Sequence, residues 1–245
     1  PDGRSLDTDP PFVVSTTPPN YTTRFNGNTI TIEFSEYVDH RAVEGAVFIS
    51  PSVGTLKFDW SGRELHITFF EKLRLNTTYV VTIGTDAADL NNHNKMVQAY
   101  SLAFSTGDDI DHGSITGRVF SRRDTDPPLG VMVFAYRLQD QNADTLNPSV
   151  TKPDFVTQTG KNGEFALPHL SFGVYRIVAV RDEYKNLLYD PEVDDYASAP
   201  SDVSVTPADT MKSGLWLKLA REDTTAPRLI KVAATNRHHL VAEFS

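Results

Sequence analysis

The residues best suited to binding a ligand lie in an acidic stretch, residues 181–197, which reads RDEYKNLLYDPEVDDYA. Calcium in proteins takes six to eight oxygen ligands, many of them carboxylates. The stretch therefore predicts a Ca²⁺ site, and the candidate ligands are Asp182, Asp190, Glu192, Asp194 and Asp195.

The spacing of these carboxylates leaves a second interpretation open. An EF-hand-like loop that starts at Asp182 needs an oxygen ligand at 184 and glycine at 187, where this chain has Tyr184 and Leu187. The stretch is also typical of an acidic surface loop without metal. The cluster of Glu36, Asp39 and His40 is likewise either a metal site or a solvated turn.

Signatures of catalysis are absent from the sequence. The patterns G-x-S-x-G, H-E-x-x-H, G-x-x-x-x-G-K and G-x-G-x-x-G do not occur. The chain has no cysteine, which excludes a cysteine nucleophile, a disulfide framework and a thiolate metal site. We therefore expect no enzymatic activity.

Length and charge narrow the classes of protein further. The 245 residues suit two small domains, and the formal net charge of −9 disfavours a nucleic-acid partner. No apolar run approaches the roughly 18 residues that span a bilayer. The chain begins without Met and without a signal peptide, so we expect a mature or truncated N-terminus.

Hydrophobic residues recur with a period of two, which is typical of half-buried antiparallel strands. In TITIEF, residues 29–34, the side chains of Ile30, Ile32 and Phe34 share one face. About seven such segments in the first hundred residues predict an immunoglobulin-like sandwich. A second set between 113 and 219 predicts another β-sandwich, in which GKNGE at 160–164 forms a hairpin turn.

A repeated proline motif precedes two of the predicted domains, and a third copy, at 124–128, is predicted as a turn inside the second sandwich. DTDPP occurs at 7–11 and 124–128, and DTTAP occurs at 223–227. Proline denies a ladder donor, so sheets end there. The LVAEFS segment at 240–245 echoes ITIEFS at 30–35, which predicts the start of a further domain. The predicted division is a spacer at 1–11, an Ig-like domain at 12–108, a second sandwich at 109–221, and a linker with the first strands of another Ig-like domain at 222–245.

Two longer patterns resemble known families. The pattern DTDPPFVVSTTPPN…ITIEFSEYVD…LNTTYVVTIG…DLNNHN…LAFSTGD resembles the bacterial Ig-like domain of Bacteroidota envelope lipoproteins. The pattern GSITGRVF…PPLGVMVFAY…TGKNGEFALPHLSFGVYRIVAV resembles the carboxypeptidase-regulatory, transthyretin-like β-domain. Their order resembles a widespread Bacteroidota lipoprotein architecture.

The resemblance implies a location and two modifications. It implies a lipidated Cys just upstream of Pro1, outside this sequence, and an anchor in the outer membrane at the cell surface, with the periplasmic face as the alternative. It also implies O-glycosylation at Asp-Thr sites, with candidate acceptors Thr145, Thr210 and Thr224. These sites are otherwise ordinary turns.

The sequence also predicts the contacts of three aromatic side chains. Tyr79 begins a strand, so we expect its hydroxyl to hydrogen-bond an upstream backbone group, as tyrosines do in sandwiches. Trp60 and Trp216 lie in alternating strands, and we expect both to pack in cores. Sugar stacking would require either indole on an exposed face.

The sequence supports three hypotheses for function. The first is a non-catalytic, modular surface lipoprotein that acts as a scaffold or accessory subunit of an outer-membrane protein complex. The second is a glycan-binding module of a nutrient-capture system. The third is a non-catalytic part of a larger hydrolase. The first is favoured because neither predicted domain carries a ligand-binding signature.

Overall fold

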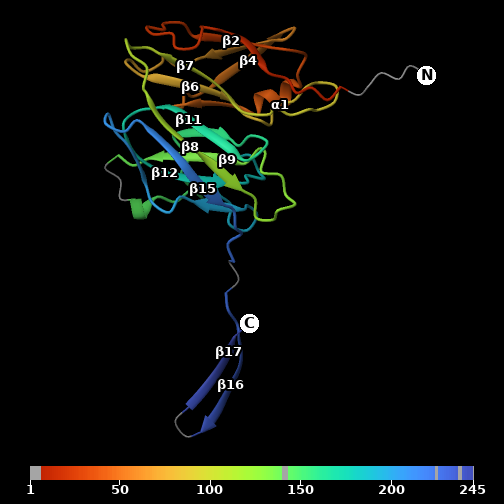
Figure 1. The fold of residues 1–245 in the computed structure, drawn as a ribbon, viewed down its shortest axis with the longest axis vertical. Helices are drawn as coiled ribbons and strands as arrows, with labels where there is room; N and C mark the ends of the chain where they lie inside the picture. The colour runs from red at the N-terminus through yellow and green to blue at the C-terminus, as the bar shows by residue number, and fades with distance from the viewer. Residues whose placement is uncertain (1–6, 140–142, 224–225, 237–238, 245) are drawn as a thin grey trace, which may run out of the picture.

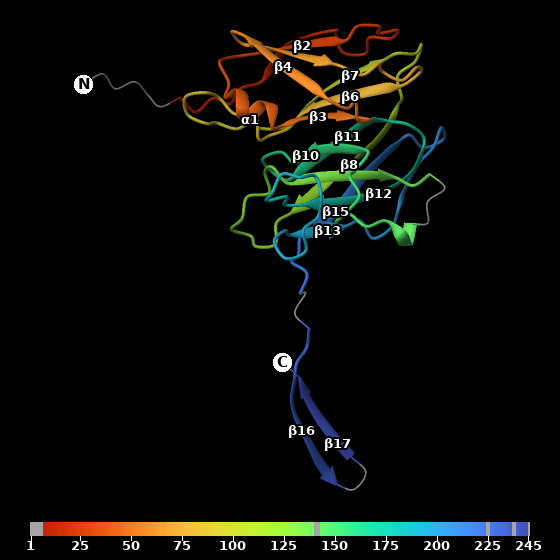
Figure 2. The same ribbon diagram turned by 180° about the vertical axis from the view of Figure 1, so that it is seen from behind.

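The computed structural model describes residues 7–139, 143–223, 226–236 and 239–244 (Figure 1). Nearly all its regular elements are β-strands, which confirms the predicted all-β fold. Two β-sandwiches lie one above the other, and a two-stranded hairpin lies beyond the second (Figures 1 and 2).

The first sandwich packs a sheet of order β1-β2-β5-β4 against a sheet of order β3-β6-β7. The strands are β1 (Val13–Thr17), β2 (Thr29–Phe34), β3 (Val47–Ser50), β4 (Leu56–Ser61), β5 (Glu64–Phe69), β6 (Thr78–Ile83) and β7 (Tyr100–Ser105). The alternation in the sequence produces the core, because Ile30, Ile32 and Phe34 are fully buried while the residues between them are not.

Two aromatic side chains of this sandwich behave as the sequence predicts. The buried Tyr79 hydroxyl accepts a hydrogen bond from the Arg74 amide at 2.9 Å, which confirms the expected bond to upstream backbone. Trp60 packs against the core, and its Nε1 donates to Glu44 at 2.8 Å.

A short helix, α1 (His40–Glu44), replaces the turn expected after β2. Asp39 is its N-cap and accepts the Ala42 amide at 3.1 Å, which satisfies a helix-end donor. The His40 ring stacks on Trp60, with centroids 4.0 Å apart. Glu36, Asp39 and His40 therefore do not form a common ligand set, because the cap and the stacked ring have separate structural roles.

The second sandwich packs a sheet of order β10-β9-β12-β13, in which β14 also pairs with β12, against a sheet of order β11-β8-β15. The strands are β8 (Gly113–Phe120), β9 (Met132–Arg137), β10 (Phe155–Gln158), β11 (Glu164–Leu170), β12 (Gly173–Val180), β13 (Tyr196–Ser198), β14 (Val203–Val205) and β15 (Met211–Lys218), with a 3₁₀ turn, η1 (Ala143–Thr145). Strands β8 and β15 run parallel.

The Asn162-Gly163 turn does not close the predicted hairpin. Strands β10 and β11 flank it, but β10 pairs with β9 in one sheet and β11 pairs with β8 in the other. Gly163 has φ +81°, and a Cβ there would lie 2.2 Å from the Val119 carbonyl oxygen. Gly163 does adopt the positive φ that favours Asn-Gly turns, but this turn leads the chain from one sheet to the other and not into a hairpin.

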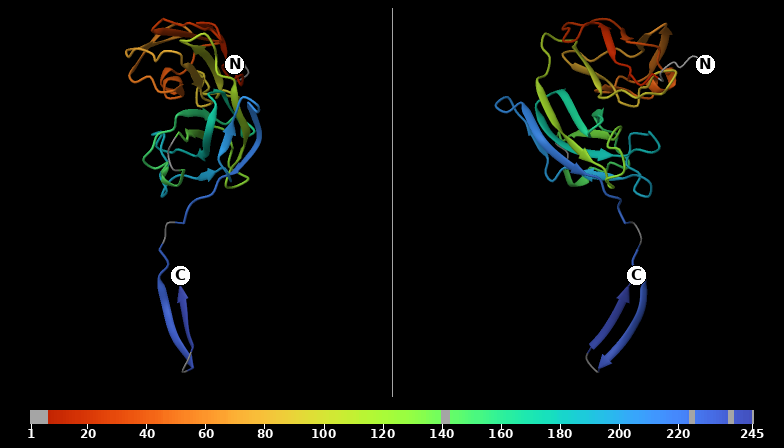
Figure 3. Two further views of the ribbon diagram at one scale, coloured as in Figure 1. Left: turned by 90° about the vertical axis from the view of Figure 1, so that its left-hand side faces the viewer. Right: turned by 45° about the vertical axis from the view of Figure 1, so that its right-hand side comes forward.

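The C-terminal hairpin lies apart from both sandwiches in every view (Figure 3). It pairs β16 (Leu229–Asn236) with β17 (His239–Phe244), as the sequence predicts for this segment. Its large apolar side chains are exposed: Leu229, Ile230, Val232, Leu240, Val241 and Phe244. An isolated hairpin is marginally stable in water, so a further Ig-like domain around these strands stays a prediction.

A carboxylate organises the loop after β6. Asp89 is 1% exposed, and its Oδ1 accepts the amides of Asn91, Asn92 and His93 at 2.9, 2.6 and 3.0 Å. Its Oδ2 accepts the Asn94 amide at 3.1 Å. Burial alone would raise the pKa of Asp89, but these N–H donors lower it below its ordinary value.

Replacing Asp89 should destabilise the first sandwich. Asp89→Ala leaves four partly buried hydrogen bonds without their acceptor, so we expect a loss of about 2–4 kcal/mol in the free energy of unfolding. Asp59→Ala is the control, because that exposed residue pairs with Lys57 alone among the described residues and should cost less than about 1 kcal/mol. Urea unfolding measures both, and equal losses would contradict this role.

Candidate functional site

The two sandwiches meet in a seam where β3 and β6 face β10 and β11. Phe48 of β3 is 8% exposed and packs into an apolar cluster on the outer face of the second sandwich. The cluster comprises Met132, Phe134, Tyr136, Val156, Val178, Val180 and Tyr189. The β9–β12 sheet is therefore buried on both faces, once in its own sandwich and once under this cluster, to which the first sandwich contributes Phe48.

A polar group, here called the clasp, joins the sandwiches at one end of the seam. Gln158 accepts the Asp86 amide at 3.1 Å and donates its Nε2 to Asp86 Oδ2 at 3.1 Å. Lys95 lies 2.7 Å from Asp86 Oδ1, and Lys185 of the second sandwich lies 3.2 Å from Oδ2. The Asp86 carboxylate thus contacts Lys95 of its own sandwich and both Lys185 and the Gln158 side-chain amide of the other.

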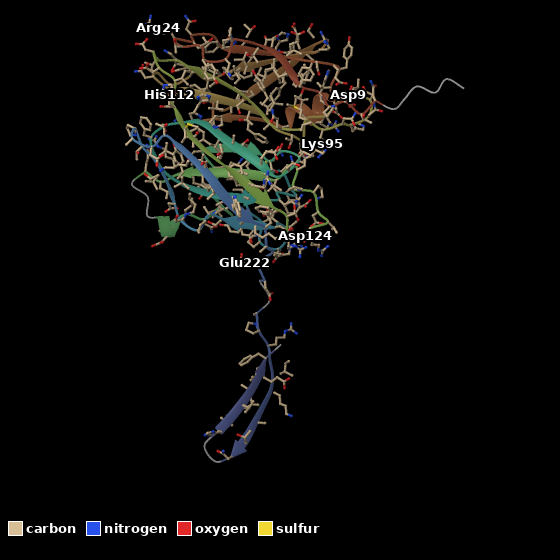
Figure 4. The ribbon with its side chains drawn as sticks, in the orientation of Figure 1. Asp9, Arg24, Lys95, His112, Asp124 and Glu222 are labelled. Atoms are coloured by element: carbon tan, nitrogen blue, oxygen red, sulfur yellow. The ribbon has the colours of Figure 1, made fainter. Side chains whose placement is uncertain are left out.

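Close backbone approach surrounds the clasp. Thr85 donates its hydroxyl to the Thr159 carbonyl at 3.0 Å, and the Lys161 amide donates to the Val97 carbonyl at 3.0 Å. A Cβ at Gly84 would lie 2.1 Å from Gln158 Oε1, so glycine is required for this contact. Lys95 and His112, labelled in Figure 4, lie at opposite ends of the seam.

Two of the predicted calcium ligands, Asp182 and Asp194, already accept hydrogen bonds from backbone amides of their own loop. The Asp194 carboxylate accepts the amides of Glu183 and Asp190 at 3.1 and 2.9 Å. Asp182 accepts those of Asn186 and Leu187 at 3.2 and 2.8 Å. Burial raises the pKa of Asp194, and the charges of Asp182 and Asp190 add to that rise.

The other three predicted ligands lie differently, and Asp190 accepts the Asn186 side-chain amide at 2.9 Å. Asp195 is paired with Arg122 and Arg221, each at 3.2 Å, and Glu192 is exposed. Across the described residues, no group of three or more His, Asp or Glu side chains is arranged to hold a metal ion. The calcium site therefore stays a prediction, and in this structure its carboxylates organise the loop.

The three candidate O-glycosylation sites have different settings. Thr145 is exposed in η1, and Thr210 is partly exposed just before β15. Thr224 lies outside the described residues. Modification of these threonines stays a prediction.

Trp216 does not pack in a core, which corrects the expectation from its strand. It is 73% exposed on the outer face of β15. The neighbouring Leu215 and Leu217 point inward to the core, so Trp216 between them must point out. That alternation was present in the sequence and is the signal that identifies this exposed indole.

Trp216 forms one wall of an open depression of about 470 Å³, here called the aromatic groove. Phe120 of β8 meets its ring edge-to-face, with centroids 6.0 Å apart. The groove is lined by Thr116, Gly117, Arg118, Phe120, Glu164, Phe165, Gly214 and Trp216. It thus combines an exposed aromatic face with charged and hydroxyl groups on rigid strands.

Comparison with known families gives a match over the first sandwich. Residues 7–106 match the family model of the bacterial Ig-like domain, which supports the Ig-like domain predicted for this part of the chain. No curated protein matches the chain. Within the described residues, no helix is both long and apolar enough to cross a bilayer.

Solved structures give only distant likenesses. An L,D-transpeptidase from Mycobacterium smegmatis is 14% identical, with a TM-score of 0.31 over 86% of this chain and 90% of that chain. The major pilin subunit of Bacillus cereus is 9% identical, with a TM-score of 0.28 over 86% and 71%. The N-terminal part of the bacterial S-layer protein SbsC is 14% identical, with a TM-score of 0.28 over 87% and 44%. TM-scores this low carry no argument about what this chain does.

The clasp predicts a pH-dependent contribution to stability. Burial would raise the pKa of Asp86, but hydrogen bonds from Lys95 and Gln158 and the charge of Lys185 lower it below its ordinary value. Its stabilising effect is therefore complete above about pH 4, near the unfolded value, and is lost as pH falls through the lower folded pKa.

Asp86→Asn should cost about 1–2 kcal/mol in the free energy of unfolding at pH 7, since both ion pairs are lost. The difference from wild type should shrink as pH falls below about 4. Asp124→Asn is the control, because that carboxylate is fully exposed. Urea unfolding at several pH values measures the effect, and a pH-independent difference would contradict the assignment.

Proposed function

We propose that this chain is a non-catalytic module of a bacterial cell surface that acts as a scaffold or accessory subunit of an outer-membrane protein complex. The observation that supports this is the seam, because an apolar cluster and the clasp join the two sandwiches into one body. Such a body holds surfaces from both sandwiches at fixed spacing, as a scaffold requires.

We also propose a membrane anchor for the chain and a family for its second sandwich. A lipid anchor on a Cys upstream of Pro1 would place the module at the outer membrane, with the cell surface favoured over the periplasmic face. The second sandwich, residues 109–221, would be the carboxypeptidase-regulatory, transthyretin-like domain. The sequence resemblance supports both statements, and the two-sheet sandwich is compatible with the second.

Purification from the native envelope tests the scaffold role. A tagged chain, crosslinked in cells, should recover a defined protein partner. A variant with a loosened clasp, Asp86→Asn with Gln158→Ala, should recover about fivefold less, as expected when about 1 kcal/mol of preorganisation is lost. Asp124→Asn should recover the wild-type amount. No recovered partner, or equal recovery with the loosened variant, would count against the proposal.

A second candidate function, glycan binding, is favoured by the aromatic groove. The C–H face of a sugar ring packs on an exposed indole, while polar groups at the rim bind its hydroxyls. Trp216 supplies that face, and Arg118, Glu164 and Thr116 supply polar groups beside it. The half-buried Trp60, held by Glu44, cannot serve in the same way.

A glycan array probed with the whole chain tests this second function. We expect at least one glycan to bind, and Trp216→Ala to weaken it by about tenfold or more, since the stacking surface is lost. Met211→Ala is the matched control, because Met211 is equally exposed on the same strand but lies outside the groove. Binding unaffected by Trp216→Ala, or no bound glycan, would exclude the groove as a sugar site.

A further inference from the structure

A second cavity lies between the sandwiches, away from the aromatic groove. This interdomain cleft encloses about 480 Å³, which is within the usual size of small-ligand sites. The first sandwich contributes Pro51 and residues 74–78, excepting Leu75, and the second contributes the end of β9, the segment 151–155 and Ser171. The cleft therefore exists only while the two sandwiches are joined.

One buried group in the cleft has no partner. Tyr136 lines the cleft and is 2% exposed, yet its hydroxyl makes no hydrogen bond within the described residues. Most buried polar groups in proteins are paired, and an unpaired one is costly. Burial raises the pKa of Tyr136, with Tyr196 and Asp154 adding to the rise, so the phenol stays protonated and can donate.

Two cations of the cleft are also without partners in the described part of the chain. Arg74 of the first sandwich and Lys152 of the second are exposed side chains, and neither has an ion pair. Arg137 is different, because its guanidinium donates to the Phe172 carbonyl at 2.8 Å. Free cations from both sides of one cleft attract an anion, even in a chain whose net charge is −9.

The remaining lining groups indicate what else the ligand carries. Asp111 and Asp154 place carboxylates in the cleft, which disfavours a compact, highly charged anion such as phosphate. Asp154 Oδ2 accepts the Arg137 amide at 2.8 Å, so Asp154 Oδ1 and the Asp111 carboxylate are the acceptors that the cleft offers to hydroxyl groups. The Thr78 hydroxyl accepts the Asp111 amide at 2.9 Å, so its own proton remains available to a ligand.

We propose that the interdomain cleft binds a sugar acid, a ring that bears one carboxylate and several hydroxyl groups. Arg74 and Lys152 bind the carboxylate, Asp111 and Asp154 accept ligand hydroxyls, and Tyr136 donates to a ligand oxygen. This site does not depend on the scaffold role or on the aromatic groove. Its occupant is recognised by charge and hydroxyls rather than by stacking.

Calorimetric titration of the whole chain tests the proposal, with galacturonate and glucuronate as probes and galactose and inorganic phosphate as comparisons. At least one sugar acid should bind saturably and more tightly than galactose or phosphate. The double variant Arg74→Ala, Lys152→Ala should weaken binding at least about tenfold, since two charge-assisted contacts are lost. Tyr136→Phe should weaken it about threefold to tenfold without lowering Tm.

Three controls separate the cleft from other effects. Lys57→Ala removes an exposed cation elsewhere, Tyr37→Phe removes an exposed phenol, and Trp216→Ala alters the aromatic groove. Each should leave sugar-acid affinity unchanged. The proposal is overturned if neither sugar acid binds, if phosphate or galactose binds as well, or if binding is unchanged by the Arg74, Lys152 and Tyr136 substitutions. The exposed Arg74 and Lys152 variants keep the test valid should Tyr136→Phe fail to fold.

Discussion

The arrangement of the two sandwiches depends on hydrogen bonds between them, because polar groups buried at the seam in one sandwich need partners on the other. Asp86 belongs to one sandwich and Gln158 to the other, and each supplies both a donor and an acceptor to its partner. Glycine at position 84 allows the Gln158 amide to approach the backbone, since a Cβ would collide with it. Phe48 supplies the apolar part of the same contact. The combination fixes one orientation, because apolar burial alone is non-directional whereas paired hydrogen bonds are not.

The strands could be predicted from the sequence, but their partners could not. Alternation in segments such as 29–34 reports which residues share a face, and the burial of Ile30, Ile32 and Phe34 follows directly. Pairing depends on contacts between distant segments, which a local pattern does not contain. The Asn162-Gly163 turn illustrates this, because its positive φ is a local property whereas the sheet that each flanking strand joins is not. Helix α1 was missed although Asp39 carried its N-cap signal, since five residues are too few to show a helical stripe.

The candidate sites show the same division between composition and geometry. Carboxylates concentrated at 182–195 suggest metal ligands, yet the backbone of that loop turns its own amides toward Asp182 and Asp194. Composition does not distinguish a carboxylate that is open to bind a cation from one that accepts hydrogen bonds from the backbone of its own loop. Trp216 is the opposite case. The leucines on either side point inward, so strict alternation along the strand predicts that the indole is exposed. The interdomain cleft had no sequence signal, since its lining comes from segments more than a hundred residues apart in some pairs, such as Pro51 and Ser171.

The seam also explains how two joined sandwiches could bind a small ligand with specificity between them. Asp86 and Lys95 close one end of the seam, and the cleft beside Asp111 lies toward the end marked by His112 in Figure 4. Phe48 and its apolar cluster form the packed contact that joins the sandwiches. A joint fixed at the clasp and by packing leaves little freedom for the distance between Arg74 and Lys152. Backbones held at a set spacing lower the entropic cost of bringing the two cations to one ligand, so the contacts that make the two sandwiches one body also preorganise the walls of the cleft.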